Sequence, residues 1–174
     1  MTDIVLRNRD IDSGIVSPDR FGAPLVGCSI AFANWASAAN PTAEVLDQST
    51  AQLVTVMSQG VTVDLTTGTV TIIRDGYYDI ELILSKVSAA SASGVMDFTV
   101  QKNSASLTPS ITLGLLQPAV VNNHMAGSCK DCIALVKGDV LRNVVTGTTG
   151  GVITIAAGRF IVRQRSDATA FSQV

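Results

Sequence analysis

The segment VTVDLTTGTVTII, residues 61–73, restricts the fold more than any other part of the chain. Val61, Val63 and Leu65 alternate with polar residues, as expected for a β-strand whose side chains point to opposite faces in turn. The residues from Thr66 to Gly68 then predict a tight turn into a second strand. Similar short runs recur along the chain, and no stretch shows a sustained helical period of apolar residues. We therefore predict an all-β sandwich built from short strands.

Ten segments have the length and composition of short strands, and loops rich in Gly, Pro and small residues separate them. Residues 36–44 are predicted to form one such loop, and Ala156 to Gly158 are predicted to bend the last strand. Val, Ile and Thr are frequent throughout, and these β-branched side chains pack well on a pleated sheet. The predicted strands are 25–35, 52–57, 61–65, 69–73, 74–85, 95–103, 110–117, 128–136, 140–145 and 152–165.

Charged residues are scarce in this chain and unevenly placed. They make up 15% of the sequence, against about 25% in an ordinary soluble domain. Seven of them lie in the first twenty residues, which lead into the sequence SPDRFGAP. We predict an extended N-terminal arm over residues 1–24, a β-domain over 25–166 and a short tail over 167–174. A domain so poor in charge is expected to hide part of its surface in an oligomer.

Charge and hydropathy also exclude several classes of partner. The net charge of −2 provides no long-range field for nucleic acid, so no nucleic-acid partner is expected. The first residues, MTDIVLRNRD, lack the apolar core of a secretory signal, and no apolar run approaches the length of a membrane span. We expect synthesis and assembly in a cytoplasm without a membrane partner. Three cysteines, an odd number, do not predict a disulfide framework.

The sequence CKDC, with Cys129 and Cys132, is the one short motif that resembles a metal or redox site. His124 lies five residues before the first cysteine and could add a third ligand, but structural zinc requires four. Residues i and i+3 of a strand point to opposite faces, and redox pairs of this kind lie at a helix N-terminus. We therefore expect packing residues here, and neither a metal nor a cofactor.

No arrangement of residues in the sequence predicts catalysis. His124 is the sole histidine, and no nucleophile motif of the type Gly-x-Ser-x-Gly accompanies it. Asp79 and Glu81 have a spacing compatible with glycoside hydrolysis, but one Trp and two Tyr offer little platform for a sugar. Glycine motifs for nucleotide binding are missing as well. We expect no enzyme activity and no small-molecule substrate.

The segment RDGYYDIELILS, residues 74–85, is unusual because a strand with an apolar face also carries two carboxylates. Alternate residues from Tyr78 to Leu84 form the face that is predicted to be core. In GRFIVRQR, residues 158–165, Phe160 and Val162 are predicted to be buried in the same way. The opposite faces of the two strands contain Tyr77, Asp79, Glu81, Ile83, Arg159, Ile161, Arg163 and Arg165.

Three segments in this order, VTVDLTTGTVTIIRDGYYDIELILS, LVKGDVLRNVV and VITIAAGRFIVRQR, resemble the jelly roll of tumour necrosis factor and of complement globular heads. Members of that family typically have a Gly-x-Tyr sequence that opens a central strand and a Lys-Gly-Asp-type turn before a late strand. Their last strand contains an aromatic residue. The resemblance covers residues 45–165 and implies a ten-strand jelly-roll sandwich.

The same resemblance implies that the two charged strands are neighbours in one sheet, whose outer face packs around the three-fold axis of a homotrimer. Asp79 and Glu81 would then meet Arg163 and Arg165, within or between subunits. Opposite charges that face each other across strands contribute about 0.2–1 kcal/mol each. We predict that this face forms the trimer interface. The alternative is a solvated sheet face with ordinary ion pairs.

Proteins that resemble this chain are common in tailed-phage virions, where such trimers decorate the capsid or form the tips of fibres. We predict a capsid decoration (cement) protein that binds the major capsid protein on the virion surface and stabilises the assembled head. One alternative is a receptor-binding head or adhesin at the tip of a tail fibre, and another is a spore-surface or cytokine-like signalling module. The predicted capsid-binding residues of the arm are Ile4, Leu6, Arg7, Arg9, Ile15, Arg20 and Phe21.

Overall fold

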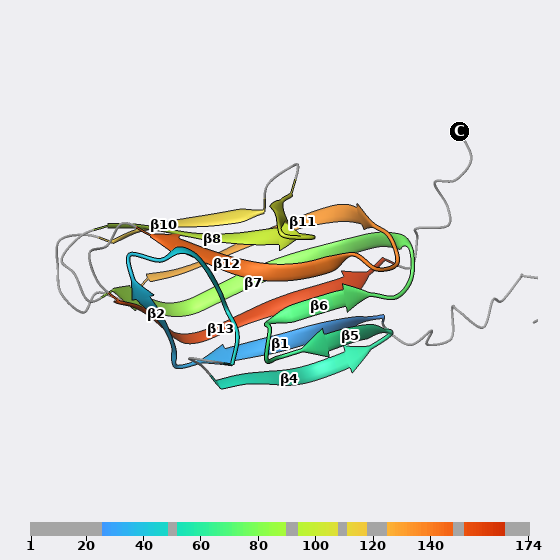
Figure 1. Ribbon diagram of the computed structural model, residues 1–174, viewed down its shortest axis with the longest axis horizontal. Helices are drawn as coiled ribbons and strands as arrows, with labels where there is room; N and C mark the ends of the chain where they lie inside the picture. Colours follow the sequence, from blue (N-terminus) through green and yellow to red (C-terminus); the bar gives the residue numbers. More distant parts are fainter. Residues whose placement is uncertain are drawn as a thin grey trace, which may run out of the picture.

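Thirteen β-strands make up the secondary structure of the residues that the computed structural model describes, which are 26–48, 52–89, 94–107, 111–117, 125–147 and 152–165. The strands form two sheets that pack face to face as a sandwich (Figure 1). No helix in these residues has the length and apolar character required to cross a membrane. The prediction of an all-β fold is confirmed.

One sheet, here called sheet A, has six antiparallel strands. They are β1 (Gly27–Ala33), β2 (Trp35–Ala39), β4 (Gln52–Gln59), β7 (Gly76–Ala89), β11 (Met125–Leu135) and β13 (Val152–Gln164). Five of them follow the order β11-β7-β13-β1-β4, and β2 pairs with β13 as well. The last strand of the chain therefore lies in the middle of sheet A, between β7 and β1.

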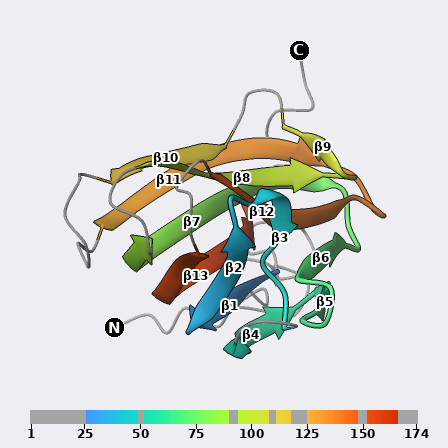
Figure 2. The ribbon, with the colours of Figure 1, turned by 60° about the vertical axis from the view of Figure 1, so that its left-hand side comes forward.

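The second sheet, sheet B, has seven strands and covers the inner face of sheet A (Figure 2). They are β3 (Thr42–Val45), β5 (Val61–Asp64), β6 (Thr69–Ile72), β8 (Gly94–Lys102), β9 (Ala105–Ser106), β10 (Thr112–Gln117) and β12 (Val140–Gly147). Their order is β10-β8-β12-β6-β5, with β3 paired to β12 and β9 paired to β8. The chain crosses repeatedly between the sheets, for example from β6 to β7 and from β12 to β13, which is the connectivity of a jelly roll.

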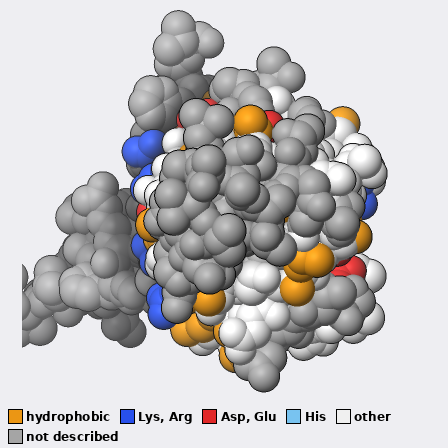
Figure 3. Space-filling view, turned by 90° about the vertical axis from the view of Figure 1, so that its left-hand side faces the viewer, with side chains coloured by type: hydrophobic (Ala, Val, Ile, Leu, Met, Phe, Trp, Pro, Cys, Tyr) orange, Lys and Arg blue, Asp and Glu red, His pale blue; other side chains and the backbone are white. Residues whose placement is uncertain are grey.

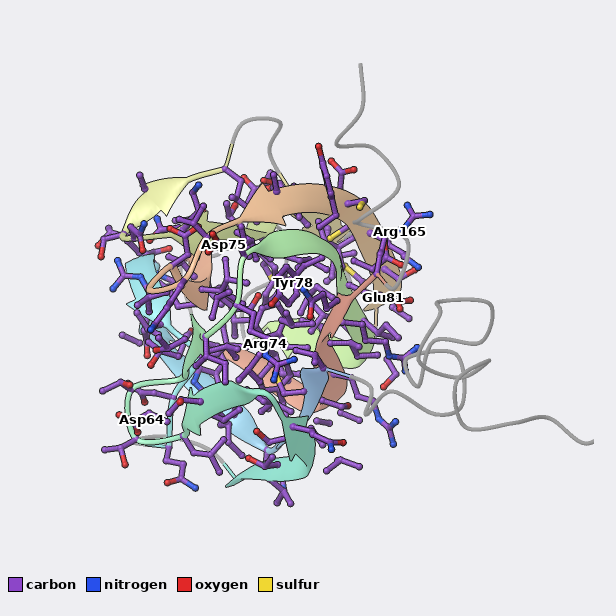
Figure 4. The ribbon with its side chains drawn as sticks, turned by 90° about the vertical axis from the view of Figure 1, so that its right-hand side faces the viewer. Asp64, Arg74, Asp75, Tyr78, Glu81 and Arg165 are labelled. Atoms are coloured by element: carbon purple, nitrogen blue, oxygen red, sulfur yellow. The ribbon has the colours of Figure 1, made fainter. Side chains whose placement is uncertain are left out.

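The core lies between the two sheets and is formed by the apolar faces that strand alternation predicts. On β7, Tyr78 to Leu84 alternate between buried and more exposed positions, and Phe160 and Val162 of β13 are fully buried beside them. The hydroxyl of Tyr78 donates a hydrogen bond of 2.8 Å to the carbonyl oxygen of Arg74 at the end of the sandwich (Figure 4). The buried ring is therefore satisfied at its polar end.

The predicted hairpin forms between β5 and β6, and its turn depends on two specific residues. Gly68 has a φ of +63°, a left-handed conformation that favours glycine, and a Cβ atom there would collide with the carbonyl oxygen of Leu46. The Asp64 carboxylate accepts hydrogen bonds from the backbone N–H groups of Thr66 at 2.9 Å and Thr67 at 3.4 Å. A hydrogen bond from the Thr67 side chain, together with these backbone bonds, lowers the pKa of Asp64.

The Lys-Gly-Asp turn after β11 is held by Asp139, which is one of the few buried charged residues. Its carboxylate accepts hydrogen bonds from the Asn103 side chain at 2.8 Å and from the Val136 backbone N–H at 2.9 Å. The ammonium group of Lys102 lies 3.7 Å away. Burial opposes ionisation of this carboxyl, but the hydrogen bonds and the lysine outweigh it and lower the pKa of Asp139. One carboxylate thus ties the β11–β12 turn to the end of β8.

Two details of the predicted strand pattern are wrong. Residues 36–44 were expected to form a loop, but β2 and β3 occupy most of this segment and pair with β13 and β12. Asn34 and Asn40 adopt positive φ values of 53° and 48°, which turns the chain before and after β2 without glycine. The strand predicted over 74–85 begins at Gly76 and continues to Ala89. The predicted arm, 1–24, and tail, 167–174, lie outside the described residues.

Candidate functional site

The outer face of sheet A is the surface on which the sequence placed its charged residues. Strand β7 contributes Tyr77, Asp79, Glu81 and Ile83 to it, and β13 contributes Arg159, Ile161 and Arg163. The flanking strands add Lys130 and Cys132 from β11 and Ser29 and Ala31 from β1. We call these eleven residues the charged face. Lys and Arg atoms follow one margin of the molecule in Figure 3, with hydrophobic atoms beside them toward its lower end.

The strand register decides which of these side chains are neighbours. Asp79 lies directly opposite Arg163, and Glu81 lies opposite Ile161. On the other side of β7, Lys130 lies opposite Glu81. The prediction that β7 and β13 are adjacent is therefore confirmed. That the face forms a trimer interface stays a prediction.

Arg165 occupies a different position from the other predicted residues because it follows the end of β13. Its backbone N–H donates a hydrogen bond of 2.9 Å to the carbonyl oxygen of Tyr77. Figure 4 shows Arg165 and Glu81 on the same side of the molecule, while Arg74 and Tyr78 lie nearer its middle. Arg165 is thus close to the end of the charged face, and Tyr77, which is 44% exposed, marks that end.

The charges of this face are only partly paired within the chain. The ammonium group of Lys130 lies 3.5 Å from the Asp79 carboxylate, which is a partly exposed ion pair between neighbouring strands. In the described part of the chain, neither Glu81 nor Arg163 forms an ion pair, and the same is true of Arg159. The face therefore presents one carboxylate and two guanidinium groups that are available to a partner.

Two residues at the middle of the charged face are buried, although they point away from the core. Ser29 is 6% exposed and Ile161, directly opposite on β13, is 7% exposed. The hydroxyl oxygen of Ser29 has no hydrogen-bond partner among the described residues. A buried hydroxyl that lacks a partner is unfavourable by about 1–3 kcal/mol.

Sequence reasoning missed Lys130, Cys132 and Ser29 as members of this face. The first two are two residues apart, so alternation along β11 did put them on one side of the strand. What the sequence did not show is that β11 pairs with β7 in a register that brings this side next to Asp79 and Glu81. Ser29 gave no signal, because a serine in an apolar strand is common and its burial depends on the neighbouring strands.

The cysteines behave as the strand alternation predicts. Cys129 packs against the core, whereas Cys132 lies on the charged face, opposite Asp79. In the described part of the chain, no group of three His, Cys, Asp or Glu residues is placed to hold a metal ion. Cys28 is fully buried on the inner side of β1. His124 and the predicted arm residues, from Ile4 to Phe21, lie outside the described residues.

We expect Cys28 to resist alkylation in the folded protein. Burial raises its pKa to about 12, so at pH 8 only about one thiol in ten thousand is ionised. Burial and, to a smaller extent, the charge of Glu81 also raise the pKa of Cys129. Mass spectrometry after a timed pulse of iodoacetamide would measure this, with a denatured sample as the control in which all three cysteines react. Rapid alkylation of Cys28 in the folded chain would show that its burial is wrong.

No protein-family model matches the sequence, and no curated protein matches it either. Among solved structures, the chain is similar to the globular domain of zebrafish complement 1qA protein, with a TM-score of 0.52 and 14% sequence identity over 79% of this chain and 94% of that one. It is also similar to PRD1 vertex protein P5, with a TM-score of 0.47 and 15% identity over 79% of this chain and 95% of that one.

The first of these similarities shows the fold. The chain has the jelly roll of complement globular heads, as the order of its turns and strands predicts. At 14% identity this likeness does not extend to activity or to particular residues. The function must therefore be argued from the charged face.

Proposed function

We propose that the protein is a structural protein of a phage virion, which assembles as a homotrimer and decorates the capsid as a cement protein. The observation that supports the trimer most directly is the incomplete pairing on the charged face. Glu81, Arg159 and Arg163 have no ion pair among the described residues. A neighbouring subunit in a closed trimer would supply ion-pair partners for these charges.

The simplest contact of this kind is an ion pair between β7 of one subunit and β13 of its neighbour. The carboxylate of Asp79 is already held by Lys130, so Glu81 is the acid that remains for the neighbouring subunit. Arg163 or Arg159 of that subunit would meet it, and Tyr77, which is 44% exposed, would supply apolar area around the pair. In a cyclic trimer every such contact occurs three times, because the same two patches meet at each interface.

In this proposal the N-terminal arm, residues 1–24, is the part that contacts the major capsid protein. The arm combines apolar residues with much of the charge of the chain, which suits binding to a partner surface. A trimer that binds only the assembled lattice stabilises that lattice by mass action. Assembly would take place in the host cytoplasm, and the finished location would be the capsid surface. The proposal involves no nucleic acid, membrane, cofactor or small-molecule substrate.

The molar mass in solution tests the trimer, and binding to heads tests the decoration. Light scattering should give about 54 kDa, three times the 18.1 kDa chain, with or without residues 1–24. A mass of 18.1 kDa at micromolar concentrations would contradict the proposed interface.

Heads assembled from the shell protein of the same virus should bind the full chain and should not bind the chain without residues 1–24. Soluble, unassembled shell protein is the control, and it should not bind either form. Binding to bacterial envelopes instead of heads would contradict decoration and favour the head of a tail fibre.

A further inference from the structure

The strand β4 lies at an edge of sheet A and has a partner on one side only. It pairs with β1, and in the described part of the chain no strand pairs with its other side. Figures 1 and 2 show β4 at the lower margin of the ribbon. Gln48 donates a side-chain hydrogen bond of 3.2 Å to the carbonyl oxygen of Leu53 near the beginning of the strand. The rest of β4 presents an open edge.

Apart from a register shift at Val56 in its pairing with β1, this edge lacks the features that usually prevent edge strands from pairing with other chains. Its sequence, QLVTVMSQ, contains no charged residue and no proline. Val54 and Val56 are 57% and 54% exposed, which places them among the most exposed large apolar residues described. Two other edge strands are better protected, since β11 carries Lys130 and Asp131 and β5 has only four residues. An uncharged edge of eight residues requires a cover.

The first described residue, Val26, directly precedes β1 and lies beside the end of β4. Its side chain packs against Gly60, the residue directly after β4, and its carbonyl oxygen accepts a hydrogen bond of 2.7 Å from Gln164. The segment before Val26 therefore starts at the end of β4. A strand of eight residues spans about 26 Å, and residues 10–25 can span about 50 Å when extended. The segment is long enough to turn back and lie along β4.

The beginning of that segment has the sequence of a short edge strand. Residues 3–9 read DIVLRNR, in which three apolar residues, Ile4, Val5 and Leu6, are flanked by charged ones. Val and Ile favour strands, and consecutive apolar residues supply an apolar side chain to each face of the sheet in either register. Charged residues on an edge strand prevent further pairing. The same seven residues would thus cover β4 and provide a protected edge in its place.

We propose that residues 3–9 pair with the free edge of β4 in the same chain and form an additional strand of sheet A. The chain itself favours this occupant over a second copy. A tether of fifteen or so residues holds the segment near the edge at an effective concentration of about 1 mM, well above that of another chain in a dilute sample. This pairing is proposed for the free protein, before it binds a capsid, and it does not depend on the proposed capsid role.

Hydrogen–deuterium exchange of the full chain tests the pairing. Val5→Pro removes a backbone donor from the segment, whereas the matched control Val5→Thr keeps both the donor and the β-branched side chain. We expect a peptide that covers residues 52–59 to exchange at least ten-fold faster in Val5→Pro than in the wild type, and to be unchanged in Val5→Thr. Peptides from β7 and β13 should be unchanged in both variants. Equal exchange of β4 in Val5→Pro and the wild type would overturn the proposal.

Thiol crosslinking identifies the chain that supplies the strand. A variant with Leu6→Cys and Val56→Cys, in which Cys129 and Cys132 are replaced by serine, is treated with a short bifunctional maleimide. Val56 is exposed and lies outside the core, so its replacement should leave the fold intact. We expect a crosslink within one chain, which runs as a monomer on a denaturing gel and links the peptides of residues 6 and 56 when the digest is analysed by mass spectrometry. A dimer band would assign the strand to another copy, and no crosslink at all would show that the segment is elsewhere; both results overturn the proposal.

Discussion

Replacement of Arg163 by glutamate is expected to convert the proposed trimer into monomers. Arg163 lies opposite Asp79 on the neighbouring strand of its own chain, and Lys130 already pairs with that carboxylate. The reversal therefore removes a cation that is free to reach a neighbouring subunit and adds a third carboxylate near Asp79 and Glu81. Loss of a buried interfacial charge pair costs about 2–5 kcal/mol, and the trimer contains three such interfaces. Light scattering at micromolar concentrations should show a single species near 18.1 kDa.

Two double variants separate contacts within a chain from contacts between chains. Arg163→Glu with Glu81→Arg exchanges the two charges that have no partner in the described chain, so it should restore the trimer in part. Arg163→Glu with Asp79→Arg restores only the cross-strand pair and also places a cation beside Lys130, so it should leave the protein monomeric. Arg74→Glu is a matched control, because Arg74 is an exposed arginine away from this face (Figure 4). A trimeric Arg163→Glu variant with unchanged melting would contradict the charged interface.

Replacement of Asp139 by alanine is expected to destabilise the chain by about 3 kcal/mol, without a direct effect on the charged face. The change leaves the Val136 N–H and the Asn103 amide without their acceptor in a partly buried network, and it removes the partner of Lys102. For a domain of this size the loss corresponds to a fall of about 10 °C in melting temperature. Asp139→Asn should be nearly as severe, because its amide group would face donors. Asp131→Asn is the control. The Asp131 carboxylate accepts a hydrogen bond of 2.7 Å from the N–H of the adjacent residue, Cys132, and the amide oxygen of asparagine can accept the same bond.

The contribution of Asp139 should disappear in acid. Its pKa is lowered in the folded chain, so the unfolded chain binds the proton more tightly. The stabilisation is therefore complete above the unfolded value of about 3.9 and is lost as the pH falls through the lower folded value. Urea unfolding of the wild type and Asp139→Asn at pH 7 and at pH 3 measures this difference. A difference between the two proteins that is as large at pH 3 as at pH 7 would contradict the role of the ionised carboxylate.

The sequence predicted the features of this fold that depend on local pattern, and it missed those that depend on distant partners. The β5–β6 hairpin follows from alternation and from the glycine that its turn requires, all within residues 61–73. Strands β2 and β3 are small and rich in alanine, and they exist because β13 and β12 offer them a pairing edge. No local pattern contains that information, since the partners lie about a hundred residues further along the chain.

The residues of the candidate site were likewise predicted only where local pattern was sufficient. Alternation placed Asp79 and Glu81 on one side of β7 and Arg163 on one side of β13. The resemblance to complement heads predicted that the two strands are neighbours. The register shows that Asp79 lies opposite Arg163, whereas Glu81 lies opposite Ile161 and not opposite an arginine. Lys130 reached the face through the pairing of β11 with β7. The ion pair of Asp79 is therefore formed with Lys130 of β11 and not with an arginine of β13.

The central position of β13 in sheet A has a consequence for the order of events during synthesis. Strands β7 and β11 are complete long before the ribosome reaches residue 152, but β1 cannot join them until β13 lies between. Sequence-distant pairings of this kind form late and slowly. Until β13 is in place, the chain thus has β1 on one side and the β7–β11 pair on the other, with no continuous charged face. In the proposed trimer, subunits could recognise one another only after this step.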